Sequence, residues 1–513
     1  MMSWSKQQEA IFGWFANGTG NLVVRARAGT GKTTSILEAV ARSRESKGRR
    51  PVLLCAFNKE IAVELVARLN RAGAETNVEA KTMHSAGFRV VRERLRSVKI
   101  DDDRGGRIAR EVAGGGAPDD VVKLVQKIAR IGKNCVPLDT TVDELVCLAE
   151  VYDLEPEEKW EDDGWTTQRL AALALAAMDR AAQMDEKPCV DFDDMIFVPL
   201  RNGWVHGRYA LVVVDECQDM NTGQLLLAQQ LAVEGASRIA VVGDDRQAIY
   251  GFRGAASNAL DSMKRALNAE EMGLTTTYRC ASLIVGEAKR IVPDYGAAPD
   301  AILGAVSNES RAGMVKRADA GDFVLSRTNA PLVTACLAFL KAGKRARIRG
   351  RDVGAALVTT VRKIGNKSTS IAEFIERLET ASEKDRARTE KRAKKRKWSK
   401  DKLAAAIDAI DDRESTLTEL CDGLTSPAEL VARITALFSD DPLAGGSIML
   451  SSVHRAKGLE TERAWLIGSS FMLRGKNMDH TEELNLCYVA ITRAKNEVVW
   501  VDEAPPLPVL LSA

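Results

Sequence analysis

A glycine-rich segment near the N-terminus carries residue types that bind phosphate. Residues 25–34 read Arg-Ala-Arg-Ala-Gly-Thr-Gly-Lys-Thr-Thr, and Ala26 stands at the first glycine position of the usual pattern. The backbone N–H groups of such a turn, and the N-terminus of the helix that follows, attract phosphate oxygens. Lys32 would contact the β- and γ-phosphates of a nucleotide, and the Thr33 hydroxyl would bind Mg²⁺. The expected nucleotide-binding residues are Ala28, Gly29, Thr30, Gly31, Lys32, Thr33 and Thr34.

Two apolar runs further along the chain end in polar residues that would complete this site. Residues 210–214 are followed directly by Asp215 and Glu216, and residues 239–242 lead to Gln247. Asp215 would bind Mg²⁺, Glu216 would orient or deprotonate an attacking water, and Gln247 would sense the terminal phosphate. The pattern therefore predicts catalytic phosphoryl transfer to water.

Three arginines stand in short, motif-like contexts, namely Arg253, Arg279 and Arg493. A planar guanidinium suits the negative charge that develops on a transferring phosphoryl group. Each of these arginines taken alone is better explained by a surface ion pair. Their placement among other motifs is what makes them candidates for catalysis.

Five ordered segments carry a family resemblance. They are D-E-C-Q-D at 215–219, G-D-D-R-Q-A-I-Y-G-F-R-G-A at 243–255, T-Y-R-C at 277–280, S-V-H-R-A-K-G-L-E at 452–460 and Y-V-A-I-T-R-A-K at 488–495. With the phosphate-binding segment, they resemble the motif series of superfamily 1 helicases, in the UvrD/Rep-like branch. The resemblance implies an enzyme that uses ATP and Mg²⁺ to move 3′→5′ on single-stranded DNA and to separate strands.

The same resemblance assigns further roles around the nucleotide. It implies that Gln8 reads the adenine edge, that Tyr278 stacks on the base and that Glu460 approaches the ribose. The three arginines would contact the γ-phosphate from both sides of an interdomain cleft. Closure of two domains around ATP would then couple hydrolysis to movement.

Candidate contacts to a nucleic-acid strand come from the same motifs. Strands are bound without sequence preference by aromatic stacking and by phosphate contacts. Phe252 stands where the family often has tryptophan, which reduces the stacking area. A core position for Phe57 and a structural hydrogen bond for His84 are the alternatives. The candidates are Phe57, Asn58, Thr82, His84, Tyr250, Phe252 and His454.

The residues leave the biological activity open between several readings. The expected partners are single-stranded DNA and its junctions with duplex, and RNA stays possible because phosphate and stacking contacts need not read the 2′-hydroxyl. One alternative is a translocase that displaces proteins from single-stranded DNA without efficient unwinding. Another is a nucleotide-gated DNA-binding switch, which the presence of Glu216, Gln247 and Arg493 disfavours.

Two charged segments have both a structural and a functional interpretation. The acidic segment 190–195 could be mistaken for a metal site, but domain packing is favoured because no partner ligands are near it in the sequence. The run from Lys384 to Lys402 contains 11 Lys/Arg and 3 Asp/Glu. A solvated helix is the favoured interpretation of this run, and contact with nucleic-acid phosphates is the alternative.

The elements that must position these residues follow from hydrophobic periodicity. Short apolar strands alternate with helical patterns before residue 69, which predicts an α/β fold with parallel sheets. With the resemblance, we expect two RecA-like P-loop motor domains, each carrying a helix-rich inserted subdomain. The predicted parts are a first motor domain at 1–88 and 206–280 with a helical insert at 89–205, and a second motor domain at 281–365 and 443–513 with a reduced accessory insert at 366–442.

Composition excludes several classes of protein. The 513 residues are 45% hydrophobic and 28% charged, with a formal net charge of +2, which is ordinary for a globular protein. Because no apolar run reaches the roughly 20 residues needed to span a bilayer, and the first residues are polar, we expect no membrane association and a cytoplasmic location. Nine cysteines without a C-x-x-C pair, and four histidines without zinc-ligand spacing, predict no structural metal site.

Overall fold

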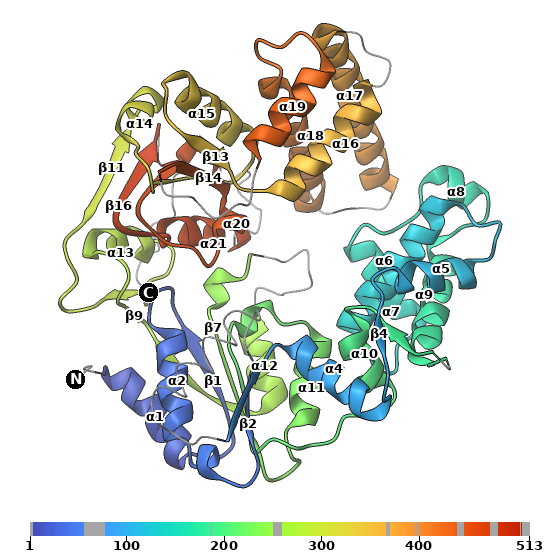
Figure 1. The fold of residues 1–513 in the computed structure, drawn as a ribbon, viewed down its shortest axis with the longest axis vertical. Helices are drawn as coiled ribbons and strands as arrows, with labels where there is room; N and C mark the ends of the chain where they lie inside the picture. The colour runs from blue at the N-terminus through green and yellow to red at the C-terminus, as the bar shows by residue number, and fades with distance from the viewer. Residues whose placement is uncertain are drawn as a thin grey trace. The chain divides into compact units, whose positions relative to one another are not determined.

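The computed structural model divides the chain into two compact units (Figure 1). Unit 1 comprises Met1–Ala26 and Gly31–Leu274, and unit 2 comprises Arg27–Thr30 and Thr275–Ala513. The first unit thus ends before residue 280, and the domain boundaries expected from the sequence stay predictions. The described residues are 4–55, 77–185, 187–249, 259–365, 370–395, 398, 400–438, 446–471, 481–502 and 504.

Unit 1 is built on a six-stranded parallel sheet with strand order β3-β2-β6-β7-β1-β8. All four residues of β2 and of β6 are buried, as expected for strands covered on both faces. The carboxyl ends of parallel strands share one edge, so the residues that follow β1, β6 and β7 meet there. The strands are β1 (Asn21–Ala26), β2 (Val52–Cys55), β3 (Val78–Lys81), β6 (Leu211–Val214), β7 (Arg238–Gly243) and β8 (Ala269–Leu274).

Helices cover both faces of this sheet. On one face, Phe12 and Ile36 of α1 and α2 pack with Val24 of β1. On the other face, α4, α10, α11 and α12 pack with alternate strand residues such as Val23. The alternation follows from the two-residue period of a strand. The helices are α1 (Lys6–Asn17), α2 (Lys32–Arg42), α4 (Met83–Arg94), α10 (Asp194–Arg201), α11 (Thr222–Leu231) and α12 (Ala259–Leu267), with the short helices η1 (Arg44–Lys47), η2 (Cys217–Asp219) and η3 (Asp245–Gln247).

A group of five helices is inserted between α4 and α10, and Figure 1 shows them gathered together. Apolar residues at helical spacing, such as Val125 and Ile128, pack against Ala174 and Met178 in a core that also includes Phe197 of α10. The parallel pair β4 (Lys99–Ile100) and β5 (Cys189–Val190) joins the two connecting segments. The helices are α5 (Arg104–Ala113), α6 (Asp119–Cys135), α7 (Val142–Val151), α8 (Glu158–Asp162) and α9 (Thr167–Ala182).

Unit 2 contains a second six-stranded parallel sheet with strand order β11-β16-β15-β12-β14-β13. The central strands β12 and β14 are buried along their whole length, whereas the edge strand β11 has no buried residue. A separate parallel pair is formed by β9 (Thr276–Thr277) and β10 (Gly296–Ala297). The sheet strands are β11 (Ala305–Glu309), β12 (Phe323–Ser326), β13 (Ala346–Ile348), β14 (Ile448–Ser452), β15 (Thr461–Ile467) and β16 (Ala494–Val501).

The helices of unit 2 include an inserted group between β13 and β14. In this group, Phe374 and Leu417 belong to the same core as Trp465 of the sheet, so the insert and the sheet share apolar packing. The inserted helices are α16 (Arg351–Gly365), α17 (Ile371–Lys395), α18 (Lys400–Leu420) and α19 (Pro427–Leu437). The others are α13 (Ser282–Lys289), α14 (Arg311–Arg317), α15 (Ala330–Lys341), α20 (Val453–Ala456), α21 (Thr481–Ile491) and the short helix η5 (Gly468–Ser470).

The predicted fold class, α/β with two parallel sheets and helix-rich insertions, is confirmed. All nine cysteines are free, and six of them are buried. Among the described residues, no helix is both long enough and apolar enough to cross a bilayer. The same part of the chain contains no group of three or more His, Cys, Asp or Glu residues placed to hold a metal ion.

Candidate nucleotide and nucleic-acid sites

The turn between β1 and α2 ends in a glycine with left-handed backbone. Gly31 has φ of 72° and precedes Lys32, the first residue of α2. Glycine adopts this conformation without the steric cost that a Cβ atom imposes. Lys32, Thr33 and Thr34 therefore lie in the first turn of α2, where free backbone N–H groups favour anions.

Lys32 forms an ion pair with the carboxylate that follows β6. Its Nζ atom lies 3.0 Å from Glu216, and the lysine side chain is 10% exposed. Burial lowers the pKa of Lys32, but nearby carboxylates, Glu216 foremost, raise it well above its ordinary value. Lys32 is therefore charged at neutral pH and can attract a phosphate.

Thr33 and Asp215, the two residues expected to bind Mg²⁺, lie side by side in unit 1. The Thr33 hydroxyl donates to Asp215 Oδ2 at 3.2 Å, and the backbone N–H of Glu216 donates to Asp215 Oδ1 at 2.9 Å. Burial and the neighbouring Glu216 raise the pKa of Asp215 to about 6, against the opposing effect of Lys32. An alcohol and a carboxylate are the hard oxygen ligands that Mg²⁺ accepts, so the two residues fit this ion.

Glu216 has an unusual backbone conformation. Its φ of 54° lies in the left-handed region, which costs about 1–3 kcal/mol for a residue with a side chain. Its carboxylate accepts hydrogen bonds from Lys32 Nζ and from Gln218 Nε2. Strain of this kind is typical of functional positions, and here it directs the carboxylate towards α2.

Gln218 and Asp244, two buried residues that were not among the predicted site residues, connect the ends of β6 and β7. Gln218 Oε1 accepts a hydrogen bond from the backbone N–H of Asp244 at 3.0 Å, and Gln247 Nε2 donates to Asp244 Oδ2 at 2.7 Å. A Cβ atom on Gly243 would lie 2.5 Å from Gln218, so glycine permits this approach. Gln218 belongs to the D-E-C-Q-D segment, so its membership of this motif is the sequence feature that could have identified it as a site residue. The structure brings Gln247 to this edge of the sheet.

Gln8 lies on α1 and contacts the first turns of α2. Its Nε2 donates to Ser35 Oγ at 2.9 Å, its Oε1 accepts from the backbone N–H of Ser5, and 4% of the residue is exposed. Both polar ends of the amide are therefore engaged within unit 1. A role of Gln8 in reading the adenine edge stays a prediction.

Residues 27–30 of the phosphate-binding segment belong to unit 2, where two tyrosines bind the backbone of Ala28. The N–H of Ala28 donates to the hydroxyl of Tyr488 at 2.8 Å, and the hydroxyl of Tyr295 donates to the carbonyl of Ala28 at 3.0 Å. Arg27 forms an ion pair with Asp294 at 3.0 Å. The conformation of Ala28 is thus held by side chains distant in sequence.

Gly29 is packed closely against β9 and the residues that follow it. Its φ is 70°, and a Cβ atom there would lie 2.4 Å from Thr277 Oγ1 and 2.6 Å from Arg279 Cβ. The backbone N–H of Tyr278 donates to the carbonyl of Gly29 at 2.9 Å, while the Tyr278 side chain is 50% exposed. The hydroxyl of Thr30 donates to the carbonyl of Arg27, which closes the turn.

Arg279, Glu460 and Arg493 lie together in unit 2. Arg279 Nε and Lys495 Nζ each lie 2.9 Å from Glu460, and these cations, Lys495 first, lower the pKa of this carboxyl. Arg493 is 1% exposed and donates to the carbonyls of Val489 and Leu459 at 2.9 Å. Burial, and then the repulsion from Arg279, lower the pKa of Arg493 to about 10. This buried cation, bonded to neutral oxygens, would be stabilised by an anion.

Thr82 and His84 open α4 beside an exposed aromatic ring. Thr82 is the N-cap of α4 and accepts a hydrogen bond from the backbone N–H of Ser85. The His84 ring stacks on Phe192, with centroids 3.7 Å apart and planes at 21°, and Phe192 is 53% exposed. Burial lowers the pKa of His84 to about 4, with Asp193 opposing the shift. The neutral imidazole and the phenyl ring form a pair on which a base could stack.

One cavity of about 880 Å³ in unit 1 joins the two candidate sites. Asp215 and Glu216 line it, and so do Thr82, His84 and Phe192. The carboxylates predicted to be catalytic and the candidate strand contacts therefore line the same cavity. The other residues that line it include α6 side chains such as Asn134.

The remaining predicted strand contacts divide into two groups. His454 lies in unit 2 on α20, and burial, followed by repulsion from Arg327 and other nearby cations, lowers its pKa to about 4. The other predicted site residues, Phe57, Asn58, Tyr250, Phe252 and Arg253, lie outside the described residues.

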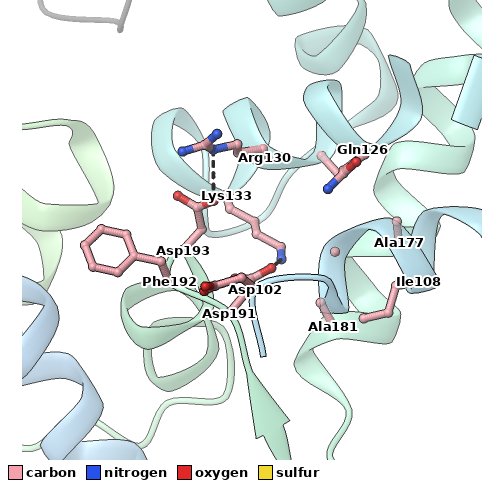
Figure 2. Close-up of a pocket in the computed structure, with 12 residues that line it drawn as sticks. Asp102, Ile108, Gln126, Arg130, Lys133, Ala177, Ala181, Asp191, Phe192 and Asp193 are labelled. Carbon is pink, nitrogen blue, oxygen red and sulfur yellow. Dashed lines mark ion pairs between the residues drawn. The ribbon is translucent and has the colours of Figure 1, made fainter. Parts of the chain in front are cut away.

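The acidic segment 190–195 is occupied by ion pairs, which supports its structural interpretation. Asp194 is fully buried and accepts from Lys133 Nζ at 2.6 Å and from Arg104. Lys133 also lies 3.8 Å from Asp191. Figure 2 shows Lys133 directed towards Asp191, with the Phe192 ring pointing away from them, around a small cavity of about 220 Å³. The ion pairs connect α5, α6 and the start of α10.

The basic run from Lys384 to Lys402 covers the end of α17 and the start of α18. Arg386 of the run pairs with Asp411 at 2.7 Å, which neutralises one of its positive charges, whereas Asp385 of the run pairs with Arg413 at 2.8 Å. Other residues of the run are exposed, namely Lys384, Arg388, Lys391, Lys394, Lys395 and Lys400.

Comparison with known proteins gives matches over most of the chain. Residues 4–268 match the UvrD/REP helicase N-terminal domain, and residues 140–501 match the UvrD-like helicase C-terminal domain. The two matched ranges overlap and together reach from α1 to the last strand of the second sheet.

Individual relatives are similar over a shorter region. The chain is 26% identical over 304 residues to the ATP-dependent DNA helicase Rep of Escherichia coli (strain K12), covering 53% of this chain and 41% of the relative. It is 27% identical over 308 residues to the ATP-dependent DNA helicase PcrA of Staphylococcus epidermidis (strain ATCC 12228 / FDA PCI 1200), covering 56% and 39%. The chain thus spans about two fifths of the length of these relatives. The two domain matches confirm the resemblance seen in the motifs, and the chain belongs to the UvrD/Rep-like helicase family.

Proposed function

We propose that this protein is an ATP-dependent DNA helicase that moves 3′→5′ along single-stranded DNA. The observation that carries the proposal is the cavity of about 880 Å³, because Asp215 and Glu216 share it with the stacked pair His84 and Phe192. Membership of the UvrD/Rep-like family supports the same activity, and the polarity follows from the family resemblance.

The residues of unit 1 support a mechanism for ATP hydrolysis. Lys32 and the N-terminus of α2 would bind the phosphates, and Thr33 and Asp215 would hold Mg²⁺, whose charge would offset that of the phosphate oxygens. Glu216, oriented by Lys32 and Gln218, positions a water and accepts its proton. The oxygen of this water bonds to the γ-phosphorus while the bond to the β-phosphate oxygen breaks, giving ADP and phosphate.

The residues of unit 2 would complete the nucleotide site when ATP is bound. We propose that Arg279 and Arg493 contact the γ-phosphate, together with Arg253, and that Tyr278 stacks on the adenine while Glu460 approaches the ribose. The buried, cationic state of Arg493 supports this role, since an anion would stabilise it. Release of the γ-phosphate after hydrolysis would let the two units separate, which couples the chemical cycle to stepping.

A translocase that displaces proteins from DNA is the second candidate. The insert of unit 2 favours it, because its four helices from α16 to α19 provide a small accessory subdomain. A forked duplex and a protein-blocked single strand distinguish the two activities: a helicase unwinds the fork, whereas the translocase clears only the protein. RNA as the track is tested by replacing the DNA strand.

Steady-state ATPase activity with and without single-stranded DNA tests the proposal. We expect strong stimulation by DNA, weaker stimulation by RNA of the same sequence, and loss of turnover in Glu216→Gln, which keeps the size of the side chain but removes the base. ATP turnover that ignores every strand would contradict the proposed function. Stimulation by DNA without strand separation would favour the translocase.

A further inference from the structure

We propose that Asn134 is a positioning residue that transmits strand binding at the His84–Phe192 pair to the loop that carries Glu216. The inference rests on the proposed function, because it concerns how a bound strand accelerates ATP hydrolysis. None of the hydrogen bonds of Asn134 among the described residues reaches the predicted catalytic residues, which are Lys32, Thr33, Asp215 and Glu216. Its role is therefore to link two sites.

Asn134 makes hydrogen bonds in two directions from the end of α6. Its Nδ2 donates to Asp193 Oδ1 at 3.1 Å and to the carbonyl of Arg130 at 3.0 Å. Its Oδ1 accepts from Asn221 Nδ2 at 3.0 Å. The amide thus uses both donors and its acceptor, and a shift of one partner changes the geometry of the others.

On the nucleotide side, Asn221 has a fixed position. It is the N-cap of α11, where its Oδ1 accepts from the backbone N–H of Gln224 at 2.9 Å and its own N–H donates to Gln224 Oε1. Only η2 and Met220 separate Asn221 from Glu216. A displacement of Asn221 is therefore passed to the short loop whose strained conformation aims the Glu216 carboxylate.

On the strand side, Asp193 is held between two residues of α6. Arg130 Nε lies 3.0 Å from Asp193 Oδ2, and Asn134 bonds the other oxygen. Asp193 directly follows Phe192, whose exposed ring stacks on His84. A base that stacks on Phe192 and changes its orientation would move the Asp193 backbone, and the bonded amide of Asn134 would move with it.

The three hydrogen-bonded residues of this connection line the same cavity. Asn134, Asn221 and Asp193 all border the space of about 880 Å³ that also borders Glu216 and Phe192. The bridge through Asn134 joins Asp193 to the N-cap of α11 by two side-chain hydrogen bonds. The geometry therefore assigns Asn134 to coupling rather than to chemistry or to strand affinity.

Asn134→Ala in the full chain tests the assignment. We expect basal ATPase without DNA, KM for ATP and Kd for a fluorescent single-stranded oligonucleotide to stay within about threefold of wild type. The turnover number at saturating DNA is expected to fall at least tenfold. Asn202→Ala is the matched control, because Asn202 Nδ2 also bonds two partners, the carbonyls of Ala182 and Val198, within the same region.

Asn221→Asp provides a second variant in case Asn134→Ala does not fold. Aspartate caps a helix as well as asparagine does, so the variant preserves the start of α11 and replaces the donor to Asn134 by a carboxylate oxygen, which cannot bond to Asn134 Oδ1. We expect Asn221→Asp to lose DNA stimulation of ATPase activity to the same extent as Asn134→Ala. The variant that combines both substitutions should show no larger loss. Normal stimulation in a folded Asn134→Ala or Asn221→Asp protein would overturn the inference. Absence of stimulation in wild type would instead contradict the proposed function.

Discussion

At the scale of single residues, Glu216 carries the most specific arrangement in unit 1. Its left-handed backbone and its bonds to Lys32 and Gln218 fix the carboxylate, although the strained conformation costs about 1–3 kcal/mol. Lys32 compensates the negative charges that follow β6. These bonds hold the carboxylate in one orientation, as electrostatic preorganisation requires.

Lys32→Ala is expected to abolish ATP turnover and to leave binding of single-stranded DNA intact. The loss should be at least about 100-fold, because the variant removes a preorganised cation from the phosphates. Initial rates of phosphate release and oligonucleotide anisotropy measure the two effects. Lys123→Ala, which removes an exposed lysine of α6, is the control and should behave as wild type. Sustained turnover in Lys32→Ala would refute the assignment of the phosphate site.

His84 and His454 are expected to make folding depend on pH. Burial lowers the pKa of each to about 4, whereas an imidazole in an unfolded chain titrates near about 6.5. Between these values the unfolded chain binds protons that the folded chain does not, so the free energy of unfolding decreases as pH falls from about 6.5 towards about 4. Above pH about 6.5, both histidines are neutral in the folded and the unfolded chain, so their contribution to the free energy of unfolding no longer changes with pH.

Urea denaturation between pH 7.5 and pH 5 measures this effect. His84→Gln removes one of the two shifted imidazoles, so its free energy of unfolding should depend less steeply on pH. His206→Gln, at an exposed position, serves as the control and should retain the wild-type slope. An identical slope in all three proteins would show that His84 is not held in its neutral form.

At the scale of elements, the strands and the turns that follow them were predictable from the sequence. Apolar runs such as 210–214 end in Asp215 because buried parallel strands need apolar residues and deliver polar ones at a common edge. The pairs Lys133–Asp194 and Asn134–Asn221 were not predictable, because they join residues 61 and 87 positions apart. No local pattern reports such contacts, since their geometry depends on how helices pack.

Asp194→Asn is expected to destabilise unit 1 strongly. The variant leaves Lys133 and Arg104 buried without their carboxylate, and removing one partner of a buried ion pair typically costs about 3–5 kcal/mol. Chemical denaturation measures the loss. Asp119→Asn is the control, because Asp119 pairs with Arg110 at the surface, where the cost is about 0–1 kcal/mol. Equal stability of both variants would contradict a structural role for the segment 190–195.

The basic ends of α17 and α18 allow a test of the alternative left open by the sequence. If this run binds nucleic-acid phosphates, replacing Arg388, Lys394 and Lys400 by glutamine should flatten the salt dependence of DNA affinity. The slope of log K against log salt concentration becomes shallower by about 0.7–0.9 for each phosphate that the protein no longer neutralises. An unaltered slope would support the solvated-helix interpretation. The control replaces the exposed residues Lys123, Lys289 and Lys316 by glutamine.

At the scale of the whole molecule, the proposed motor depends on two units that each contain a parallel sheet and a helical insert. Unit 1 contains Asp215, Glu216 and the stacked rings of His84 and Phe192 in one cavity, and unit 2 contains Arg279 and Arg493. In the proposed function, Arg279 and Arg493 stabilise the charge on the transferring phosphoryl group, so hydrolysis needs residues of both units. The nucleotide would therefore also control movement of the units, which is the central claim.

Displacement of streptavidin from biotinylated single-stranded DNA tests that claim most directly. A protein that moves 3′→5′ should release streptavidin from a 5′-biotin in the presence of ATP, much faster than spontaneous release, and should leave a 3′-biotin occupied. Glu216→Gln should release neither. Directional movement predicts this asymmetry, whereas ATP-independent release, release from the 3′ end, or no release from either end while ATP is hydrolysed would contradict it.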